Sequence, residues 1–292
     1  MTSLNGKAVV ITGAGSGLGA AYARHAAHLG ASVVVNDINP GAAQSTVDSI
    51  LASGGKAVAY AGDVSSWSYA QSLVDACIDA FGAIDGIVNN AGILRIGKIL
   101  DMTEADLRQM VQVNLIGTAA CASHAARRML AAGKGGSIVN VASGSQAGDI
   151  ALGGYSATKG GVASLTYSWA MELRGTGIRV NALSPLAETA MAAQNKALMA
   201  EQAASREVHY AALPDPNVNA PVVTFLLSDA ASQINGQVVR IAGKQLSFVT
   251  HPMIADPVLE GGWDDAAVQA AFAGTLADRQ QPLGLGYTRK PN

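Results

Sequence analysis

The sequence predicts an α/β protein with a doubly wound, seven-stranded parallel sheet and helices on both faces. Short apolar runs alternate with longer amphipathic segments through most of the 292 residues. Such runs are typical of strands that are buried on both faces, and the segments between them are long enough for crossover helices. Several runs end in glycine or short polar residues, as expected where parallel strands reach a ligand-binding edge.

The first three elements form a unit that can bind a dinucleotide. A strand at 7–12 leads into the glycine-rich turn 13–19, a helix follows to about residue 29, and a second strand at 33–35 ends at Asp37. The glycines let the backbone approach a pyrophosphate, and the helix N-terminus supplies N–H donors. Asp37 can accept hydrogen bonds from ribose hydroxyls and would repel a 2′-phosphate, so NAD is favoured over NADP. A purely structural turn is the alternative interpretation.

The same alternation continues through the middle of the chain. Helices are predicted at 40–53 and 67–81, with strands at 56–61 and 84–88. The first of these strands precedes Asp63-Val64, where Asp63 either accepts from an adenine amino group or caps the next helix. The second precedes the turn Asn89-Asn90-Ala91-Gly92, which is expected at the carboxyl edge of the sheet.

A long helix is predicted at 103–132, and it contains one unusual residue. Asn114 lies in this helix among apolar neighbours. An asparagine in such a place is unfavourable unless its amide is used, either in function or in hydrogen bonds within the core.

A strand at 137–142 delivers Ser143 into a glycine-rich loop, and Tyr155 opens a helix that runs to about residue 174. Lys159 follows Tyr155 by four residues, so the two side chains share one helical face. The ammonium is expected to lower the pKa of Tyr155 from its usual value of about 10. Such a phenol can exchange a proton with a substrate oxygen that Ser143 holds. An exposed Tyr/Lys pair without function is the alternative.

The last part of the sheet is followed by a stretch of different composition. A strand at 178–183 ends before Ser184-Pro185, residues 186–214 are expected to form an irregular helical lid, and a helix at 219–227 precedes the seventh strand at 237–241. Residues 1–243 are therefore predicted to form one domain. Residues 244–292, the C-terminal extension, contain one predicted helix at 266–277 and are expected to pack on the core or on a neighbouring subunit.

Composition excludes several other classes of protein. The net charge of -2 gives no footprint for nucleic acid. No apolar run approaches the roughly 18 residues of a membrane span. Cys77 and Cys121 are expected to be buried free thiols of a cytoplasmic protein. No metal site is expected, because His25 and His28 lack a further ligand and fit a solvated helix face.

Taken together, these motifs resemble the short-chain dehydrogenase/reductase family over about residues 4–243. In order, they are Thr12-Gly13-x-x-x-Gly17-x-Gly19, Asp63-Val64, Asn89-Asn90-Ala91-Gly92, Asn114, Ser143, Tyr155-x-x-x-Lys159, and Asn181 with Pro185. The resemblance implies a Rossmann-type sheet and hydride transfer between a nicotinamide and a secondary alcohol or ketone. It also implies a homotetramer or homodimer, joined through the two long helices that carry Asn114 and Tyr155.

The resemblance also implies roles for individual residues. Tyr155 would be the general acid/base, Ser143 would polarise the substrate oxygen, Lys159 would lower the Tyr155 pKa and bind the nicotinamide ribose, and Asn114 would hold a water that relays protons. The residues expected to contact NAD are Gly13, Ser16, Gly17, Leu18, Gly19, Asp37, Asp63, Val64, Asn90, Ala91, Gly92, Tyr155, Lys159, Pro185 and Thr189.

Two features depart from the family pattern. Leu186 stands where the family usually has glycine, which affects the expected contact of Thr189 with the carboxamide. The chain also continues for about 50 residues beyond the usual end. Asn36-Asp37, the segment 90–95 and Asn235-Gly236-Gln237 resemble the branch that contains the (3R)-hydroxyacyl-CoA dehydrogenase domain of peroxisomal multifunctional enzyme type 2 (17β-hydroxysteroid dehydrogenase type 4) and bacterial steroid-degradation dehydrogenases. That branch implies a bulky apolar substrate.

Two other functions fit the sequence less well. A dinucleotide-binding protein without catalytic activity would not need the combination of Asn114, Ser143, Tyr155 and Lys159. A serine hydrolase is disfavoured because no Gly-x-Ser-x-Gly motif occurs.

Overall fold

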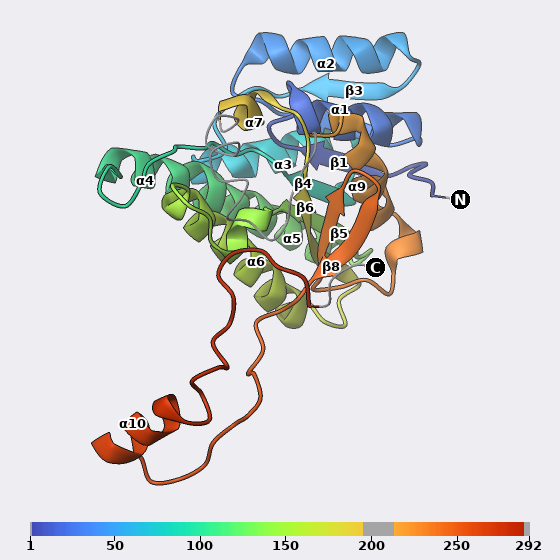
Figure 1. Cartoon of the computed structure of the whole chain (residues 1–292). Helices are drawn as coiled ribbons and strands as arrows, with labels where there is room; N and C mark the ends of the chain where they lie inside the picture. The colour runs from blue at the N-terminus through green and yellow to red at the C-terminus, as the bar shows by residue number, and fades with distance from the viewer. Residues whose placement is uncertain (1, 195–212, 289–292) are drawn as a thin grey trace.

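Within the described residues, 2–194 and 213–288 of the computed structural model, eight strands form one sheet in the order β3-β2-β1-β4-β5-β6-β7-β8 (Figure 1). The first seven run parallel: β1 (Ala8–Ile11), β2 (Ser32–Val35), β3 (Lys56–Ala59), β4 (Gly86–Asn89), β5 (Gly136–Val141), β6 (Ile178–Pro185) and β7 (Val238–Ala242). The α/β class and the doubly wound order are therefore confirmed.

The strand order reverses direction between β1 and β4. The chain moves outward from β1 through β2 to β3, returns to β4 on the other side of β1, and then continues outward to β7. At such a switch point the loops after two neighbouring strands diverge and leave a crevice at their carboxyl ends. The crevice lies between the glycine-rich turn after β1 and the Asn90 turn after β4.

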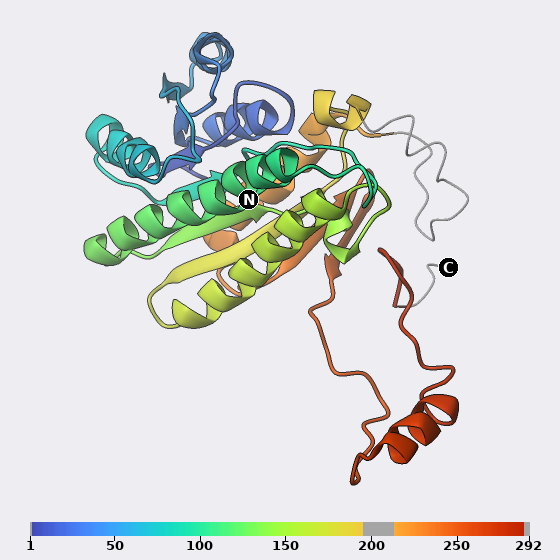
Figure 2. The same cartoon turned by 90° about the vertical axis from the view of Figure 1, so that its left-hand side faces the viewer.

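Helices cover both faces of the sheet, as Figures 1 and 2 show. One layer contains α1 (Gly17–His28), α2 (Pro40–Ala52) and α9 (Ala220–Leu227), and the other contains α3 (Trp67–Phe81), α5 (Thr118–Ala132) and α6 (Gly153–Glu172). Alternate residues of β1 divide between the two layers: Val9 and Ile11 pack in the first core, and Ala8 and Val10 pack in the second. This two-sided burial explains why β1 is a continuous apolar run.

The helix predicted at 103–132 is not one regular helix. It consists of α4 (Glu104–Met110), the π-helix η1 (Val111–Gly117) and α5, with Thr103 capping the start. Asn114 lies in the π-helical turn and is completely buried. A π turn widens the backbone spiral locally, and such turns are frequent at functional sites. The hydrophobic pattern of the sequence shows no sign of this irregularity.

The sheet has one more strand than the sequence predicted. β8 (Gln245–Val249) runs antiparallel to β7, and Ala242 pairs with Gln245 across a two-residue turn. Gly243 in this turn has a φ of 60°, which glycine adopts readily. The first residues of the C-terminal extension are thus part of the sheet.

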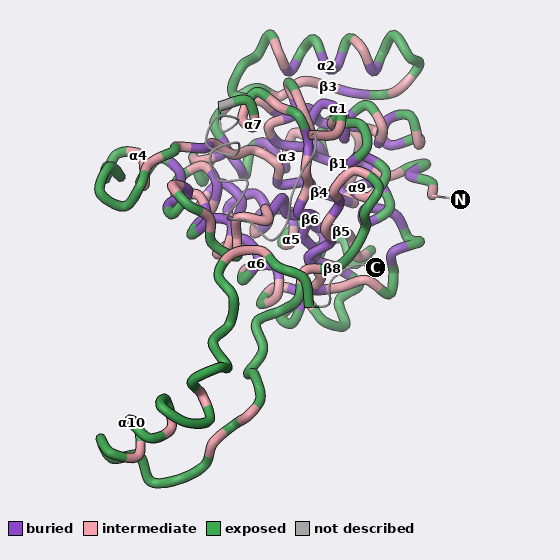
Figure 3. The backbone as a smooth tube through the Cα atoms, viewed as in Figure 1, coloured by how far each residue is buried: buried purple, intermediate pink, exposed green. Residues whose placement is uncertain are grey.

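The rest of the C-terminal extension leaves the sheet and carries the helix α10 (Asp265–Ala273) away from it (Figures 1 and 2). Figure 3 shows that nearly all of this excursion is exposed. Several large apolar side chains are exposed on it, including Met253, Ile254, Trp263 and Phe272. The remaining short helices are η2 (Gly144–Ala147), α7 (Ala190–Gln194), η4 (Pro216–Asn219) and η5 (Asp229–Ala231).

Cys77 and Cys121 are both buried free thiols, as the sequence predicted, and burial raises the pKa of each to about 12. In the part of the chain that the structure describes, no helix combines the length and apolarity needed to cross a membrane.

Candidate active site

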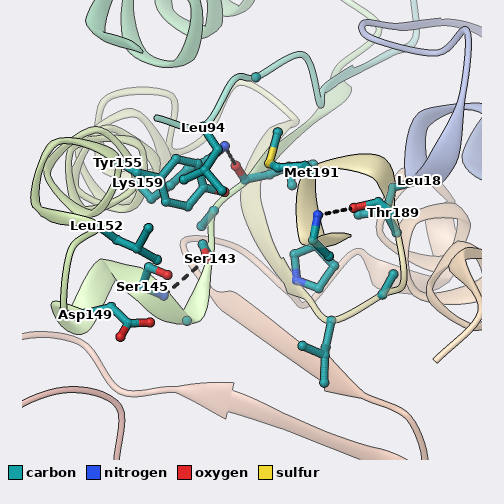
Figure 4. Close-up of a pocket in the computed structure, with 18 of the residues that line it drawn as sticks. Leu18, Leu94, Ser143, Ser145, Asp149, Leu152, Tyr155, Lys159, Thr189 and Met191 are labelled. Atoms are coloured by element: carbon teal, nitrogen blue, oxygen red, sulfur yellow. Dashed lines mark hydrogen bonds between the residues drawn. The ribbon is translucent and has the colours of Figure 1, made fainter. Parts of the chain in front are cut away.

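A cavity of about 950 Å³ lies at the carboxyl edge of the parallel sheet. Its walls come from the glycine-rich turn after β1, the ends of β2, β4, β5 and β6, the start of α6, and residues near the C-terminus. Figure 4 shows Ser143, Tyr155 and Lys159 on one side of this cavity and Leu18, Thr189 and Met191 on the other. Residues that are far apart in the sequence therefore face one shared space.

The glycine-rich turn packs tightly against the turn after β4. A Cβ on Gly13 would lie 2.8 Å from the Cα of Ala91, and one on Gly19 would lie 2.6 Å from Nδ2 of Asn90 and overlap the carbonyl oxygen of Gly13. The Asn90 amide donates to the carbonyls of Thr12 and Gly13 at 2.9 and 3.0 Å. Glycine is needed here for close backbone approach, and the same bare backbone suits a pyrophosphate.

Asp37 follows the second strand and lines the same cavity. Its Oδ2 accepts from the backbone N–H of Gly15 at 2.9 Å, and its Oδ1 accepts from the N–H of Asn39 at 3.0 Å. Two backbone donors thus hold the carboxylate at the end of the glycine-rich turn. A ribose that lay against the turn would meet an acceptor at this position.

Tyr155 and Lys159 lie in the first turns of α6, next to the end of β5. The Lys159 Nζ is 5.7 Å from the centroid of the Tyr155 ring and donates to the carbonyl of Val141 at 2.7 Å. Ser143 follows β5, and its Oγ accepts from the N–H of Ser145 at 3.2 Å. The phenol, the ammonium and the serine hydroxyl therefore surround one end of the cavity.

The prediction that Lys159 lowers the pKa of Tyr155 is wrong for this structure. Burial raises the Tyr155 pKa to about 12, and the interaction with the Ser143 hydroxyl only partly opposes this effect. Burial also lowers the pKa of Lys159 to about 8. The loss of water around both groups outweighs the attraction of an ammonium whose proton is donated to a backbone carbonyl.

Asn114 uses its amide in hydrogen bonds within the core. Its Oδ1 accepts from the N–H of Ile93 at 2.8 Å, and its Nδ2 donates to the Ile93 carbonyl at 2.9 Å and to the Thr158 hydroxyl at 3.1 Å. Asn114 therefore joins η1, the loop after β4 and the helix that carries Tyr155. These hydrogen bonds are the second of the two uses expected from the sequence, and the role of Asn114 in holding a water that relays protons stays a prediction.

The end of β6 and the loop after it close the end of the cavity that is near the glycine-rich turn. Pro185, Leu186 and Thr189 line it, and a Cβ on Gly17 would lie 3.5 Å from the Cγ2 of Thr189. The Thr189 hydroxyl accepts from the N–H of Ala192 at 3.1 Å (Figure 4). Most of the predicted lid, residues 195–212, lies outside the described residues.

Two residues predicted to contact the cofactor are placed elsewhere. The described lining of the cavity does not include Asp63 or Val64. Asp63 Oδ1 accepts from the N–H of Ser65 at 2.9 Å, and Val64 is buried. The alternative prediction, that Asp63 caps the next helix, is wrong because Ser66 caps α3.

Several lining residues belong to no sequence motif. The lining also includes Asp149, Arg240, Leu283, Gly284 and Leu285. Arg240 lies on β7 beside Ser184, and its guanidinium donates to the Ser184 hydroxyl at 3.3 Å. The last three residues belong to the C-terminal extension. No sequence motif marks them, because only the folded chain brings residue 285 next to residue 144.

Comparison with known proteins assigns the family. The family described as short chain dehydrogenase matches residues 7–200. The chain belongs to this family. It is therefore an oxidoreductase that acts on alcohols and uses a nicotinamide cofactor, which confirms that much of the prediction.

The similar proteins act on chemically varied alcohols. The hydroxyacyl-CoA dehydrogenase ChsB1 of Mycobacterium tuberculosis is 34% identical over 98% of this chain and 94% of its own length. The cyclohexanol dehydrogenase of an Acinetobacter strain is 39% identical over 83% of this chain and 96% of its own length. The crystal structure of a short chain dehydrogenase from Mycobacterium avium has a TM-score of 0.83 at 33% identity, covering 98% of this chain and 99% of that one. The two mycobacterial matches thus include most of the C-terminal extension.

Proposed function

We propose that the protein is an NAD-dependent dehydrogenase of hydrophobic secondary alcohols, of the 3-hydroxyacyl-CoA or hydroxysteroid type. The observation that carries this proposal is a single cavity with a phosphate-compatible glycine-rich turn and Asp37 at one end, and Ser143, Tyr155 and Lys159 at the other. The similarity to a hydroxyacyl-CoA dehydrogenase over nearly the whole chain supports the substrate class.

The residues at the cofactor end fit NAD. The glycine-rich turn lines the cavity through Gly13, Gly17 and Gly19, so a pyrophosphate would meet bare backbone there, and the N-terminus of α1 would supply N–H donors to it. Asp37 would accept from the ribose hydroxyls and repel a 2′-phosphate. Lys159 would donate to the nicotinamide ribose, and Pro185 and Thr189 would position the ring. When bound, the nicotinamide accepts or supplies the hydride.

The residues at the other end move the proton and hold the oxygen. In oxidation, the carbinol carbon loses a hydride and its hydroxyl proton passes to the Tyr155 phenolate. In reduction, the Tyr155 phenol donates that proton to the ketone oxygen. The Ser143 hydroxyl would donate to the same oxygen and keep it in line with Tyr155.

Much of the cavity lining is apolar. It includes Leu94, Ile150, Leu152, Leu186 and Met191. Arg95 is a basic residue that follows β4, and a CoA phosphate would need such a partner. Its guanidinium, however, hydrogen-bonds Gln109 at 2.9 Å and lies 3.6 Å from Asp106. The apolar wall therefore favours a substrate with a bulky hydrocarbon group next to the reacting carbon over a substrate with a charged group there.

The first test is NADH formation by the pure protein with NAD and three groups of alcohols: 3-hydroxyacyl-CoA thioesters, hydroxysteroids and cyclohexanol. We expect turnover of at least one group. Tyr155→Phe should reduce kcat by about 10²- to 10⁴-fold. NADH binding, measured by fluorescence, should be retained. Tyr167→Phe, on the same helix but outside the cavity lining, is the matched control and should keep normal activity. Near-normal turnover by Tyr155→Phe would refute the mechanism.

A further inference from the structure

The C-terminal extension returns to the cavity after its excursion from the domain. The chain leaves the sheet after β8, passes through α10 and comes back toward the core, as Figure 2 shows. On its return, Leu283, Gly284 and Leu285 line the catalytic cavity. The segment 283–285 therefore contributes to the wall of a site whose other parts lie at least 40 residues earlier in the chain.

The return segment packs on the loop that directly follows Ser143. The Cδ2 of Leu285 lies 3.1 Å from the position that a Cβ on Gly144 would occupy. A Cβ on Gly284 would lie 3.7 Å from the carbonyl oxygen of Gly148, and Gly284 has a φ of 80°. Glycine at 144 thus leaves space for the leucine, and glycine at 284 allows the turn that brings it there.

This contact is at the substrate end of the cavity. Leu285 touches the residue after Ser143, whereas Asp37 and the glycine-rich turn line the opposite end. The strand order agrees with this. Asp37 follows β2, whereas Arg240, which lies beside Gly144, is on β7. Four strands, β1, β4, β5 and β6, separate β2 from β7. A dinucleotide bound at the Asp37 end of the cavity would not occupy the space beside Leu285. That space would remain for the alcohol.

We propose that Leu285 is a specificity-determining residue, which contacts the apolar body of the alcohol and limits its size. This inference rests on the proposed function, since it takes the space beside Ser143 and Tyr155 as the alcohol site. Leu285 is half-buried, so its side chain presents apolar surface to the cavity without being fully enclosed by the protein. A ring or acyl chain bound next to Ser143 would complete its burial.

The test compares two probes, cyclohexanol and a fused-ring hydroxysteroid, in the full-length protein. A change of a methylene in an apolar pocket alters kcat/KM by roughly ten- to two-hundredfold. Leu285→Ala should therefore raise the ratio of kcat/KM for the steroid to that for cyclohexanol by about tenfold or more, and Leu285→Phe should lower it. The NADH dissociation constant should stay within about twofold. Leu246→Ala, an exposed leucine of β8, is the matched control and should leave the ratio unchanged.

An unchanged ratio in both Leu285 variants would overturn the inference. If the wild-type protein oxidises neither probe, a measurement without turnover tests the contact on which the inference depends. A chain ending at Pro282 should then show at least about tenfold faster hydrogen exchange of the backbone amides of 144–148 than the full chain. Equal exchange in the two chains would refute the contact itself. Failure of the proposed function and failure of the inference are thus told apart.

Discussion

At the residue scale, Lys159 has the most unfavourable surroundings of the charged groups in the candidate site. Only 4% of its surface is exposed, and its ammonium donates to a single backbone carbonyl. Burial lowers its pKa to about 8, so the folded protein holds this proton less tightly than the unfolded chain does. A charge kept in such a place at a cost to stability is typical of a functional group.

Replacing Lys159 should therefore stabilise the protein while it removes activity. Below pH 8 the buried ammonium opposes folding, so Lys159→Met should raise the free energy of unfolding at pH 7 by about 1 to 3 kcal/mol. Between pH 8 and about pH 10.5 the native lysine is neutral while the unfolded one is still charged, so wild-type stability rises and the difference shrinks. Urea unfolding at pH 7 and pH 10 measures both effects. Lys134→Met, at an exposed position, is the control, and a destabilised Lys159→Met at pH 7 would contradict this account.

Asp37 is the residue through which we expect the protein to prefer NAD over NADP. Its carboxylate is fixed by the N–H groups of Gly15 and Asn39, so it cannot easily turn away from a 2′-phosphate. Asp37→Ser should lower the ratio of kcat/KM for NAD to that for NADP by at least about tenfold, which corresponds to about 1.4 kcal/mol. Asp48→Ser, on the exposed face of α2, should leave the ratio unchanged. A wild-type protein that already prefers NADP would show that the carboxylate has another role.

At the scale of elements, the turn after β1 and the turn after β4 act as one unit. Thr12 accepts through its hydroxyl from the N–H groups of Asn90 and Ala91, both at 3.0 Å, and Asn90 donates back to the carbonyls of Thr12 and Gly13. Each turn therefore satisfies the backbone groups of the other. The sequence suggested separate roles for the two turns, and the mutual bracing became visible only in the structure.

A side chain at Gly19 should damage this unit. Its Cβ would overlap the carbonyl oxygen of Gly13 and lie 2.6 Å from the Asn90 amide, and neither group can move without breaking the bracing. Gly19→Ala should weaken NADH binding by at least tenfold and destabilise the fold by about 1 to 3 kcal/mol. Fluorescence titration and thermal unfolding are the measurements. Gly41→Ala, in α2 where a Cβ meets nothing closer than 3.4 Å, should leave both unchanged, and normal NADH binding by Gly19→Ala would show that the turn can shift.

At the scale of the whole molecule, the C-terminal extension combines an edge strand, an exposed excursion and a contact at the active site. Closing a loop of roughly thirty residues costs about 3 kcal/mol of chain entropy, and half-burying one leucine side chain gains about 1 kcal/mol. The gain does not exceed the cost, so this contact alone holds the return segment weakly. A bound apolar alcohol would stabilise the arrangement in which Leu285 packs beside Gly144. Burial of the exposed Trp263 and Phe272 against another surface would have the same effect.

The sequence alone determined the sheet, its parallel strands, the helices on both faces and the family, because each depends on patterns within short stretches. Buried parallel strands must be apolar runs, the turn must be glycine-rich, and Tyr155 and Lys159 must share a face at a spacing of four. The tertiary structure decided what depends on surroundings. It placed Asn114 in a π turn, raised rather than lowered the Tyr155 pKa, added β8 and brought Leu285 beside Gly144. The surroundings of a single side chain and the contacts between distant segments arise only when the chain folds, so no local pattern encodes them.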